Sequence, residues 1–280
     1  MRLEANEINI IRDEFLKLMD EAHPEQVYQR YMEDHTVLIP REFVQNHGIH
    51  FDLVFRKISL AKDYAPDFFY LSKSSADWNL IFVEIEKPQS RYFKNQSNDL
   101  HPDFLAGLDQ IARWRAWFDN PANVTGFIDG TIAPVRVPES MKRNKCHIKY
   151  VLVHGRRDEF EGNELRRGLI RAREADDFHI ISFDSLAEAL HTKSPLYLCV
   201  RKNEHVEIIS SKFIDDSVFS WVDPTQLKIV DELREDIIRN KFSPHFLLSI
   251  YIKKYIYIYI LFIAVFIIIY IKCCTILMDN

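Results

Sequence analysis

The sequence predicts an α/β domain in which a mixed sheet is flanked by helices. Three observations carry this prediction: an opening stretch with helical periodicity, three β-favouring segments before Lys87, and alternating helix and strand patterns after it. The chain has 280 residues, of which 47% are hydrophobic and 13% aromatic, so it can bury a full core. The sequence shows no internal repeat.

The first stretch of the chain is expected to form two helices followed by three strands. Apolar residues recur at helical spacing between Asn6 and Asp34, and Pro24 interrupts them. Three β-favouring segments then follow at residues 49–60, 66–71 and 80–83. Short connections between successive strands favour a meander.

The second half of the sequence alternates between helical and strand patterns. Residues 102–118 predict a helix with one apolar stripe, made of Leu105, Leu108, Ile111, Ala112 and Phe118. Residues 119–145, rich in Asp, Asn, Gly and Pro, predict a long loop. The later expected elements are a buried strand at 148–153, a basic helix at 163–174, a strand at 179–183, a short helix at 185–190 capped by Asp184, and strands at 196–200 and 206–209.

Four regions are expected along the chain: an N-terminal helical segment (1–45), the α/β domain (46–215), a C-terminal helical extension (216–245) and a hydrophobic tail (246–280). The tail contains YIYIYILFIAVFIIIYI, an uncharged run flanked by lysines. A run of about 17 residues is long enough for a membrane helix, and flanking lysines can reach the lipid interface. Tyr-Ile alternation is also what a TATATA repeat encodes, so a membrane anchor and translated AT-rich DNA both stay open.

Composition argues against several function classes. There are only 7 glycines and neither GxGxxG nor GxxxxGK[ST], so a Rossmann or P-loop cofactor site has no support. The 4 cysteines lack CxxC spacing and the N-terminus does not resemble a signal sequence, so we expect a cytoplasmic protein without a zinc site. The net charge is -5, although residues 241–280 hold four lysines against one aspartate. DNA binding by such an acidic body must depend on local basic clusters.

Acidic residues stand at the ends of two predicted strands. Glu84 and Glu86 follow the apolar run LIFV, and Asp67 precedes the strand before it. Strand side chains alternate, so Glu84 and Glu86 face the same way, roughly 6.6 Å apart. Neighbouring carboxylates repel each other unless a proton or a cation lies between them. A glycosidase is disfavoured, because it needs acids on opposite sides of a sugar.

Each of these residues also has a purely structural interpretation. Asp67 beside Pro66 is a common turn former, and Glu84 with Glu86 fits the solvated end of a strand. Arg156 and Arg157 can pair with acids next to them in the sequence, an interaction that contributes roughly 0–1 kcal/mol. The order of the motifs along the chain favours function over these interpretations.

Five segments together resemble the nuclease domain of the Shedu anti-phage defence family, which has a PD-(D/E)XK nuclease fold. They are DF at 67–68, FVEIEKP at 82–88, DQIARWRAW at 109–117, VHGRR at 153–157 and ISFDSL at 181–186. The resemblance covers about residues 20–195. It implies an endonuclease or nickase that cleaves DNA phosphodiesters with Mg²⁺ or Mn²⁺, in a homo-oligomer.

The resemblance also implies roles for individual residues. Asp67 and Glu84 would hold the metal, because hard dications prefer oxygen ligands. Gln110, on the following helix, would steady the water or a metal ligand. Two basic residues, Arg156 and Arg157, would contact the DNA.

One position departs from the family pattern. A lysine normally stands two residues after the glutamate, whereas this chain has Glu86 there and Lys87 one place later. We expect Glu86 to act as a ligand or base, and Lys87 to position water and phosphate. The departure leaves two alternatives open: a nuclease-like fold that has lost catalysis and binds or senses DNA, and a membrane-tethered interaction protein.

Overall fold

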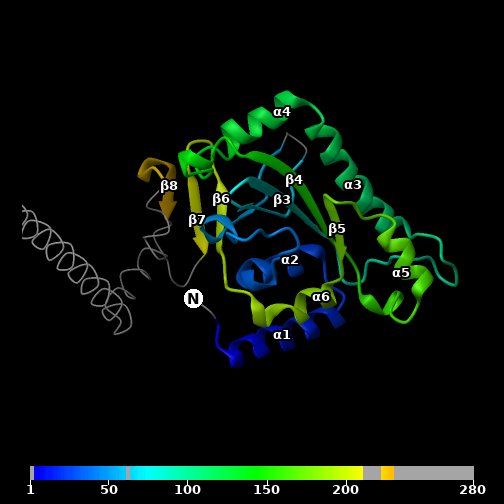
Figure 1. Cartoon of the computed structure of the whole chain (residues 1–280). Helices are drawn as coiled ribbons and strands as arrows, with labels where there is room; N and C mark the ends of the chain where they lie inside the picture. Colours follow the sequence, from blue (N-terminus) through cyan, green and yellow to red (C-terminus); the bar gives the residue numbers. More distant parts are fainter. Residues whose placement is uncertain (1–2, 61–63, 211–221, 230–280) are drawn as a thin grey trace, which may run out of the picture. The chain divides into compact units, whose positions relative to one another are not determined.

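The computed structural model describes residues 3–60, 64–210 and 222–229 (Figure 1). Its strands form one mixed sheet in the order β5-β4-β3-β2-β1-β6-β7-β8. The strands are β1 (Leu53–Arg56), β2 (Phe68–Lys73), β3 (Asp77–Ile85), β4 (Lys145–Val153), β5 (Phe178–Ile181), β6 (Tyr197–Arg201), β7 (Val206–Ser210) and β8 (Leu227–Ile229). The α-helices are α1 (Ala5–Asp20), α2 (Glu25–Asp34), α3 (Pro102–Phe118), α4 (Pro121–Gly126), α5 (Glu164–Arg171) and α6 (Phe183–Glu188). The predicted α/β class with a mixed sheet is confirmed.

The strand directions bring particular strand ends to one edge of the sheet. Strands β1, β2 and β3 pair antiparallel in succession, as the predicted meander requires. Strand β4 lies parallel to β3, and α3 forms the crossover between them. The carboxyl ends of β1, β3 and β4 therefore meet the start of β2 at the same edge.

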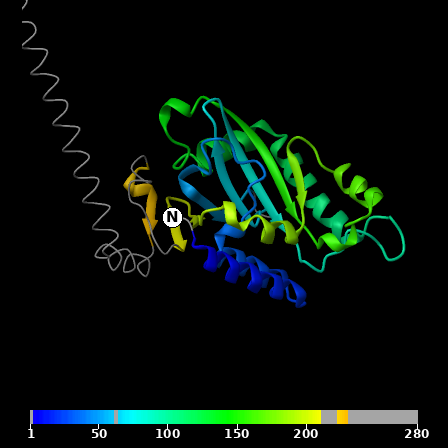
Figure 2. The same cartoon turned by 60° about the horizontal axis from the view of Figure 1, so that its bottom comes forward.

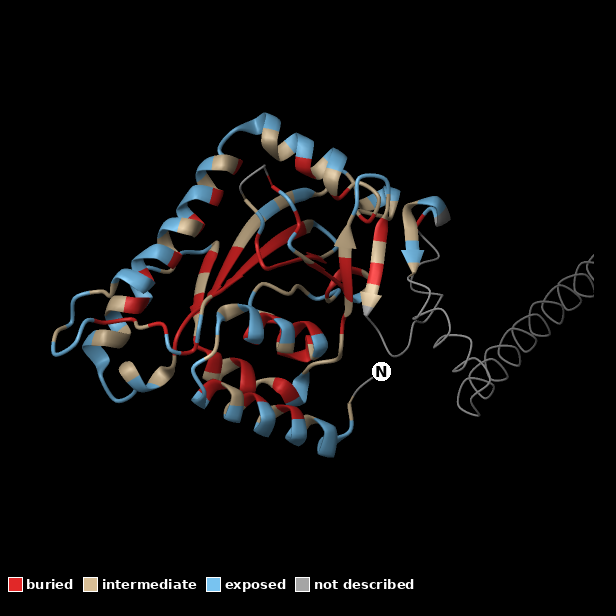
Figure 3. Cartoon of the chain, turned by 180° about the vertical axis from the view of Figure 1, so that it is seen from behind, coloured by how far each residue is buried: buried red, intermediate tan, exposed pale blue. Residues whose placement is uncertain are grey.

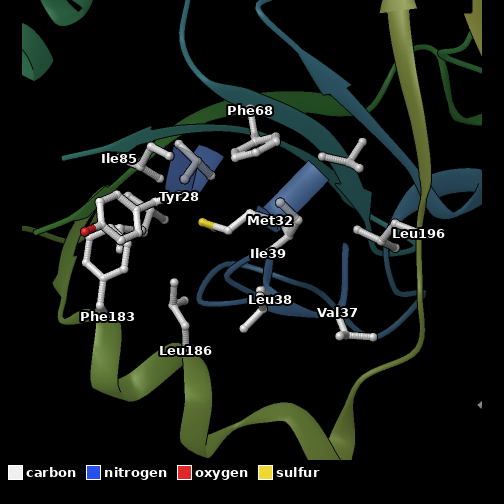
Figure 4. Packing of buried hydrophobic residues seen from close by; sticks show 14 of the residues in the cluster. Tyr28, Met32, Val37, Leu38, Ile39, Phe68, Ile85, Phe183, Leu186 and Leu196 are labelled. Carbon is white, nitrogen blue, oxygen red and sulfur yellow. The ribbon is translucent and has the colours of Figure 1, made fainter. Parts of the chain in front are cut away.

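One face of the sheet is covered by α1, α2 and α6 (Figures 1 and 2). The two predicted N-terminal helices are confirmed, and they share an apolar core with the sheet. Figure 4 shows Phe68 and Ile85 from the sheet, Tyr28 and Met32 from α2, and Phe183 and Leu186 from α6 around one interior space. Fully burying such a side chain stabilises a fold by about 1.5–3 kcal/mol.

The opposite face of the sheet is covered by α3 and α4 through an aromatic cluster. The ring of Phe82 lies 5.1 Å from that of Phe118 and 5.5 Å from that of Phe127. Buried residues concentrate in the strands between these two helical layers (Figure 3). Helices therefore cover both faces of the sheet (Figures 1 and 2).

Helix α3 begins and ends where the sequence predicts, but a different stripe is buried. The buried residues are Phe104, Gly107, Ile111, Trp114 and Phe118, whereas Leu105 is exposed. A Cβ on Gly107 would lie 3.1 Å from the side chain of Leu152 and 3.7 Å from Glu86 Oε1. The absence of a side chain at Gly107 lets α3 approach the sheet edge closely.

The predicted long loop at 119–145 is wrong in its first part. Residues Pro121–Gly126 form α4, which continues into a π-helical turn at Phe127–Thr131. Asn120 caps this helix by accepting a hydrogen bond from the N–H of Ala122 at 3.0 Å. Proline suits the first turn of a helix, so the Asn-Pro pair that ends α3 also starts the next helix.

Two further expectations need correction. Ser182, rather than Asp184, caps α6, because its hydroxyl accepts the hydrogen bond from the N–H of Ser185. In the predicted helical extension at 216–245, the described residues form a 3-10 turn at Pro224–Gln226 and strand β8 instead. Strand β8 completes a ladder with β7, and this pairing decides its conformation.

Within the described ranges, no helix combines the length and apolarity needed to cross a membrane. The hydrophobic tail at 246–280 lies outside the described residues.

Candidate active site

Three charged residues stand side by side across three strands at one edge of the sheet. The antiparallel register pairs Phe68 with Val83, which puts the preceding Asp67 beside Glu84. The register between β1 and β2 pairs Arg56 with Phe68, which puts Lys57 on the other side of Asp67. A row of Lys57, Asp67 and Glu84 results.

Asp67 is the most buried member of this row, with 0% of its surface exposed. Its Oδ2 accepts the N–H of Ile85 at 2.8 Å, and its Oδ1 accepts a hydrogen bond from Lys57 Nζ. Burial raises the pKa of Asp67, although Lys57 and the N–H of Ile85 both oppose this shift. The carboxyl group is therefore held rigidly by neighbours on both adjacent strands.

Glu84 is the second buried acid. Its Oε1 accepts a hydrogen bond from Gln110 Nε2, which reaches down from α3. Its Oε2 is buried and has no hydrogen-bond partner. Burial, and then the charge of Asp67, raise the pKa of Glu84 well above its usual range. A buried carboxylate oxygen without a hydrogen-bond partner has the chemistry to coordinate a cation.

Two half-buried acids lie around this pair. Burial, and then repulsion from Glu25 and Asp67, raise the pKa of Glu86 to about 7. Burial and the charge of Asp67 likewise raise the pKa of Glu25, the first residue of α2. We call Glu25, Asp67, Glu84 and Glu86 the acidic cluster. All four pKa values are raised, in each case chiefly by burial, which disfavours the ionised form of a carboxyl group.

The oxygen atoms of the acidic cluster suit a hard divalent cation. Mg²⁺ takes oxygen ligands and is commonly held by one or two carboxylates, with water and substrate phosphates completing its shell. Asp67 and Glu84 match that donor set, and the unpartnered Oε2 of Glu84 is free to coordinate. Among the residues with a described placement, no group of three or more His, Cys, Asp or Glu side chains forms a metal-binding set. Water or phosphate oxygens would thus have to supply the remaining ligands.

The structure brings together five of the residues predicted from sequence: Asp67, Glu84, Glu86, Lys87 and Gln110. Lys87 has an exposed side chain, and its charge lowers the pKa of Glu25 and of Glu86. It thus lies near the outer acids of the cluster. Gln110 holds one oxygen of Glu84, as a residue that orients a metal ligand would.

Arg156 and Arg157 lie apart from the acidic cluster, in ion pairs with α1 and α6. Arg156 pairs with Asp20 at 3.0 Å and with Asp184 at 2.8 Å, and Arg157 pairs with Glu188. A cavity of about 510 Å³ adjoins both arginines. Their partners come from distant segments, whereas sequence reasoning had paired them with nearby acids.

Sequence reasoning missed Lys57 and Glu25. Lys57 is the second of two basic residues, after Arg56, that follow the apolar run LVF of β1, so charged residues closing a buried strand were the available signal. Glu25 follows Pro24 and looks like an ordinary helix start. Nothing local distinguishes it from the other acids of the first two helices.

One comparison with known proteins identifies the family. The sequence model described as Shedu protein SduA, C-terminal, matches residues 22–187, a range that contains the acidic cluster and Gln110. No curated protein shows significant similarity to the chain. Because the matched range covers more than half of the 280 residues, the chain belongs to the Shedu anti-phage defence family, through the C-terminal domain of SduA.

Proposed function

We propose that this domain is a PD-(D/E)XK-type, metal-dependent endonuclease or nickase that hydrolyses DNA phosphodiesters. The observation that carries the proposal is the buried pair of Asp67 and Glu84, in which Oε2 of Glu84 has no partner. A buried acidic oxygen without a partner is costly in a purely structural role. The residues that would hold the ion are Asp67 and Glu84, with Gln110 fixing the orientation of Glu84.

In the proposed hydrolysis, each group of the site has a separate role. When bound, Mg²⁺ would neutralise charge on the scissile phosphate and lower the pKa of the attacking water. The water oxygen joins phosphorus while the bond from phosphorus to the leaving oxygen breaks. Glu86, whose pKa is raised to about 7, takes the proton that the water loses. The leaving oxygen takes its proton from solvent.

Two expectations from the family resemblance are kept as proposals. A homo-oligomer would give this acidic chain a larger surface for duplex DNA. Contact of Arg156 and Arg157 with phosphate would require DNA to compete with the carboxylates that now pair with them. The pair of Arg157 with Glu188 is partly exposed and contributes about 0–1 kcal/mol, so DNA could displace Glu188, whereas Asp184 is more buried and would be harder to displace from Arg156.

Plasmid cleavage by the full chain tests the proposed function. Relaxation and linearisation would be followed with Mg²⁺, with Mn²⁺ and with EDTA, for wild type, Asp67→Asn and Glu84→Gln. We expect metal-dependent cleavage that falls by about 10³-fold or more in both variants, since each removes a charged metal ligand. Asp109→Asn is the matched control, because Asp109 is an exposed acid next to Gln110.

Two results would contradict the proposal. The first is cleavage that persists in Asp67→Asn and Glu84→Gln at the wild-type rate. The second is a folded wild-type protein that neither cleaves DNA nor binds Mn²⁺ in calorimetry. The second result would favour the alternative, a binding or sensing module in which Glu86 marks the lost lysine.

A further inference from the structure

We propose that Lys57, directly after β1, contacts the scissile phosphate and supplies the positive charge that position 86 lacks. This inference rests on the proposed nuclease function and deepens it. It gives the phosphate contact to a residue that follows β1, whereas Glu84 belongs to β3. It replaces the expectation that Lys87 makes this contact.

The sheet register puts Lys57 in the site. Phe55, two residues earlier, packs its ring 6.0 Å from that of Phe69 on the face covered by α3. Alternation along the strand directs Lys57 to that face as well. Its N–H donates to the carbonyl of Asp67 at 3.1 Å, and its Nζ donates to Oδ1 of the same residue. Lys57 is therefore bound to the proposed metal ligand through both backbone and side chain.

Lys57 is accessible as well as anchored. Its side chain is 47% exposed, whereas Asp67 beneath it is 0% exposed. The ammonium thus lies at the entrance of the site, where a phosphate would arrive before it met the buried acids. A lysine in this position stays protonated at neutral pH, so its role is electrostatic and requires no proton transfer.

The backbone at Lys57 is itself unusual. Its φ is 46°, in the left-handed region that non-glycine residues seldom adopt and that costs of the order of 1 kcal/mol. Such conformations persist where surrounding contacts enforce them, and they concentrate at functional sites. Here the left-handed turn ends β1 while the Lys57 N–H stays hydrogen-bonded to the neighbouring strand.

Lys87 is the competing candidate, and its surroundings differ. The positive charge of Lys57 lowers the pKa of both Asp67 and Glu84. The charge of Lys87 instead lowers the pKa of Glu86 and of Glu25. The carbonyl of Lys87 accepts hydrogen bonds from the N–H groups of Ser90 and Gly155. Its backbone is held in the turn after β3, and its side chain lies by the outer acids.

The test compares three full-chain variants with wild type in plasmid cleavage with Mg²⁺. Lys57→Gln removes the charge but can still donate a hydrogen bond to Asp67, so the fold should survive. Lys57→Arg keeps the charge, and Lys87→Gln tests the competing candidate. We expect Lys57→Gln to lower kcat about 10²-fold or more with KM little changed. Lys57→Arg should recover most of that loss, because it keeps the charge, and Lys87→Gln should stay within about 3-fold of wild type.

Mn²⁺ binding by calorimetry separates this role from a structural one. Lys57→Gln should bind Mn²⁺ as tightly as wild type or more tightly, because the ammonium no longer competes for Asp67. Wild-type kcat in Lys57→Gln, an equal loss in Lys57→Arg and Lys57→Gln, or a loss confined to Lys87→Gln would each overturn the inference while leaving the nuclease proposal intact. A wild-type protein that binds metal but never cleaves DNA would remove both.

Discussion

The two faces of β3 have opposite chemistry at the same strand end. Ile85 points into the apolar core beneath α1, α2 and α6, whereas the adjacent Glu84 faces α3 with an unpartnered carboxylate oxygen. The same contrast occurs on β2, where Phe68 belongs to the apolar core and Asp67 to the acidic cluster. Adjacent residues of two neighbouring strands thus serve stability and chemistry separately.

The two kinds of residue contribute to the stability of the domain with opposite signs. The apolar face contains ordinary close packing, which favours folding. The other face buries acids whose pKa values are raised, so their ionised forms oppose folding unless a cation is present. Substitution of the buried acids and of the apolar residues next to them should therefore change stability in opposite directions, although these residues are neighbours in sequence.

The largest expected effect on stability comes from the apolar face. Ile85→Ala should lower the free energy of unfolding by about 2–5 kcal/mol, because it removes a fully buried side chain and leaves a cavity. Glu84→Gln should leave that free energy unchanged or raise it, because it removes an unfavourable charge and still accepts from Gln110. Urea unfolding without metal measures both. Equal losses in the two variants would mean that the two faces do not differ as described.

A smaller effect should appear in the pH dependence of stability without metal. The pKa of Glu86 is raised from 4.5 to about 7, so the native state binds this proton more tightly than the unfolded state does. The contribution of Glu86 is therefore full below about pH 4.5 and is lost as the pH rises to about 7. We expect a change of the order of 1 kcal/mol, because the group is partly exposed.

Thermal melting in EDTA from pH 4.5 to 8, for wild type and Glu86→Gln, isolates this contribution. The difference between the two proteins is needed because His154 acts in the opposite direction: burial lowers its pKa to about 4, so it stabilises the native state as the pH rises. The wild-type curve should fall relative to that of Glu86→Gln, and Mg²⁺ should reduce the fall. Parallel curves would show that Glu86 has an ordinary pKa.

The smallest effect is expected outside both faces, at Arg156. Arg156→Met removes ion pairs to α1 and α6 and should lower the free energy of unfolding by no more than about 1 kcal/mol. Arg30→Met, which removes an exposed pair within α2, is the control. DNA binding measured against salt tests the other role. If the slope falls by about one in Arg156→Met, the phosphate contact predicted from sequence is supported.

The local pattern of the chain was enough to predict much of the fold. Helical spacing predicted α1 and α2 with their break at Pro24, and residues 102–118 were predicted as a helix at the bounds of α3. The period of two along a strand predicted that Glu84 and Glu86 share a face, and both side chains meet α3. The buried stripe of α3 was predicted wrongly, because it includes Gly107, which has no apolar side chain to reveal it, where α3 lies against Leu152.

The sequence by itself determined which residues close the buried strands and which way they face, because both properties depend on neighbours within a few positions. The tertiary structure alone decided that Lys57 and Glu25 join Asp67 and Glu84, since strand register and helix docking link segments far apart in the chain. It also decided that Arg156 pairs with Asp20 and Asp184. Such partnerships depend on packing over the whole domain, so periodicity along the chain does not contain them.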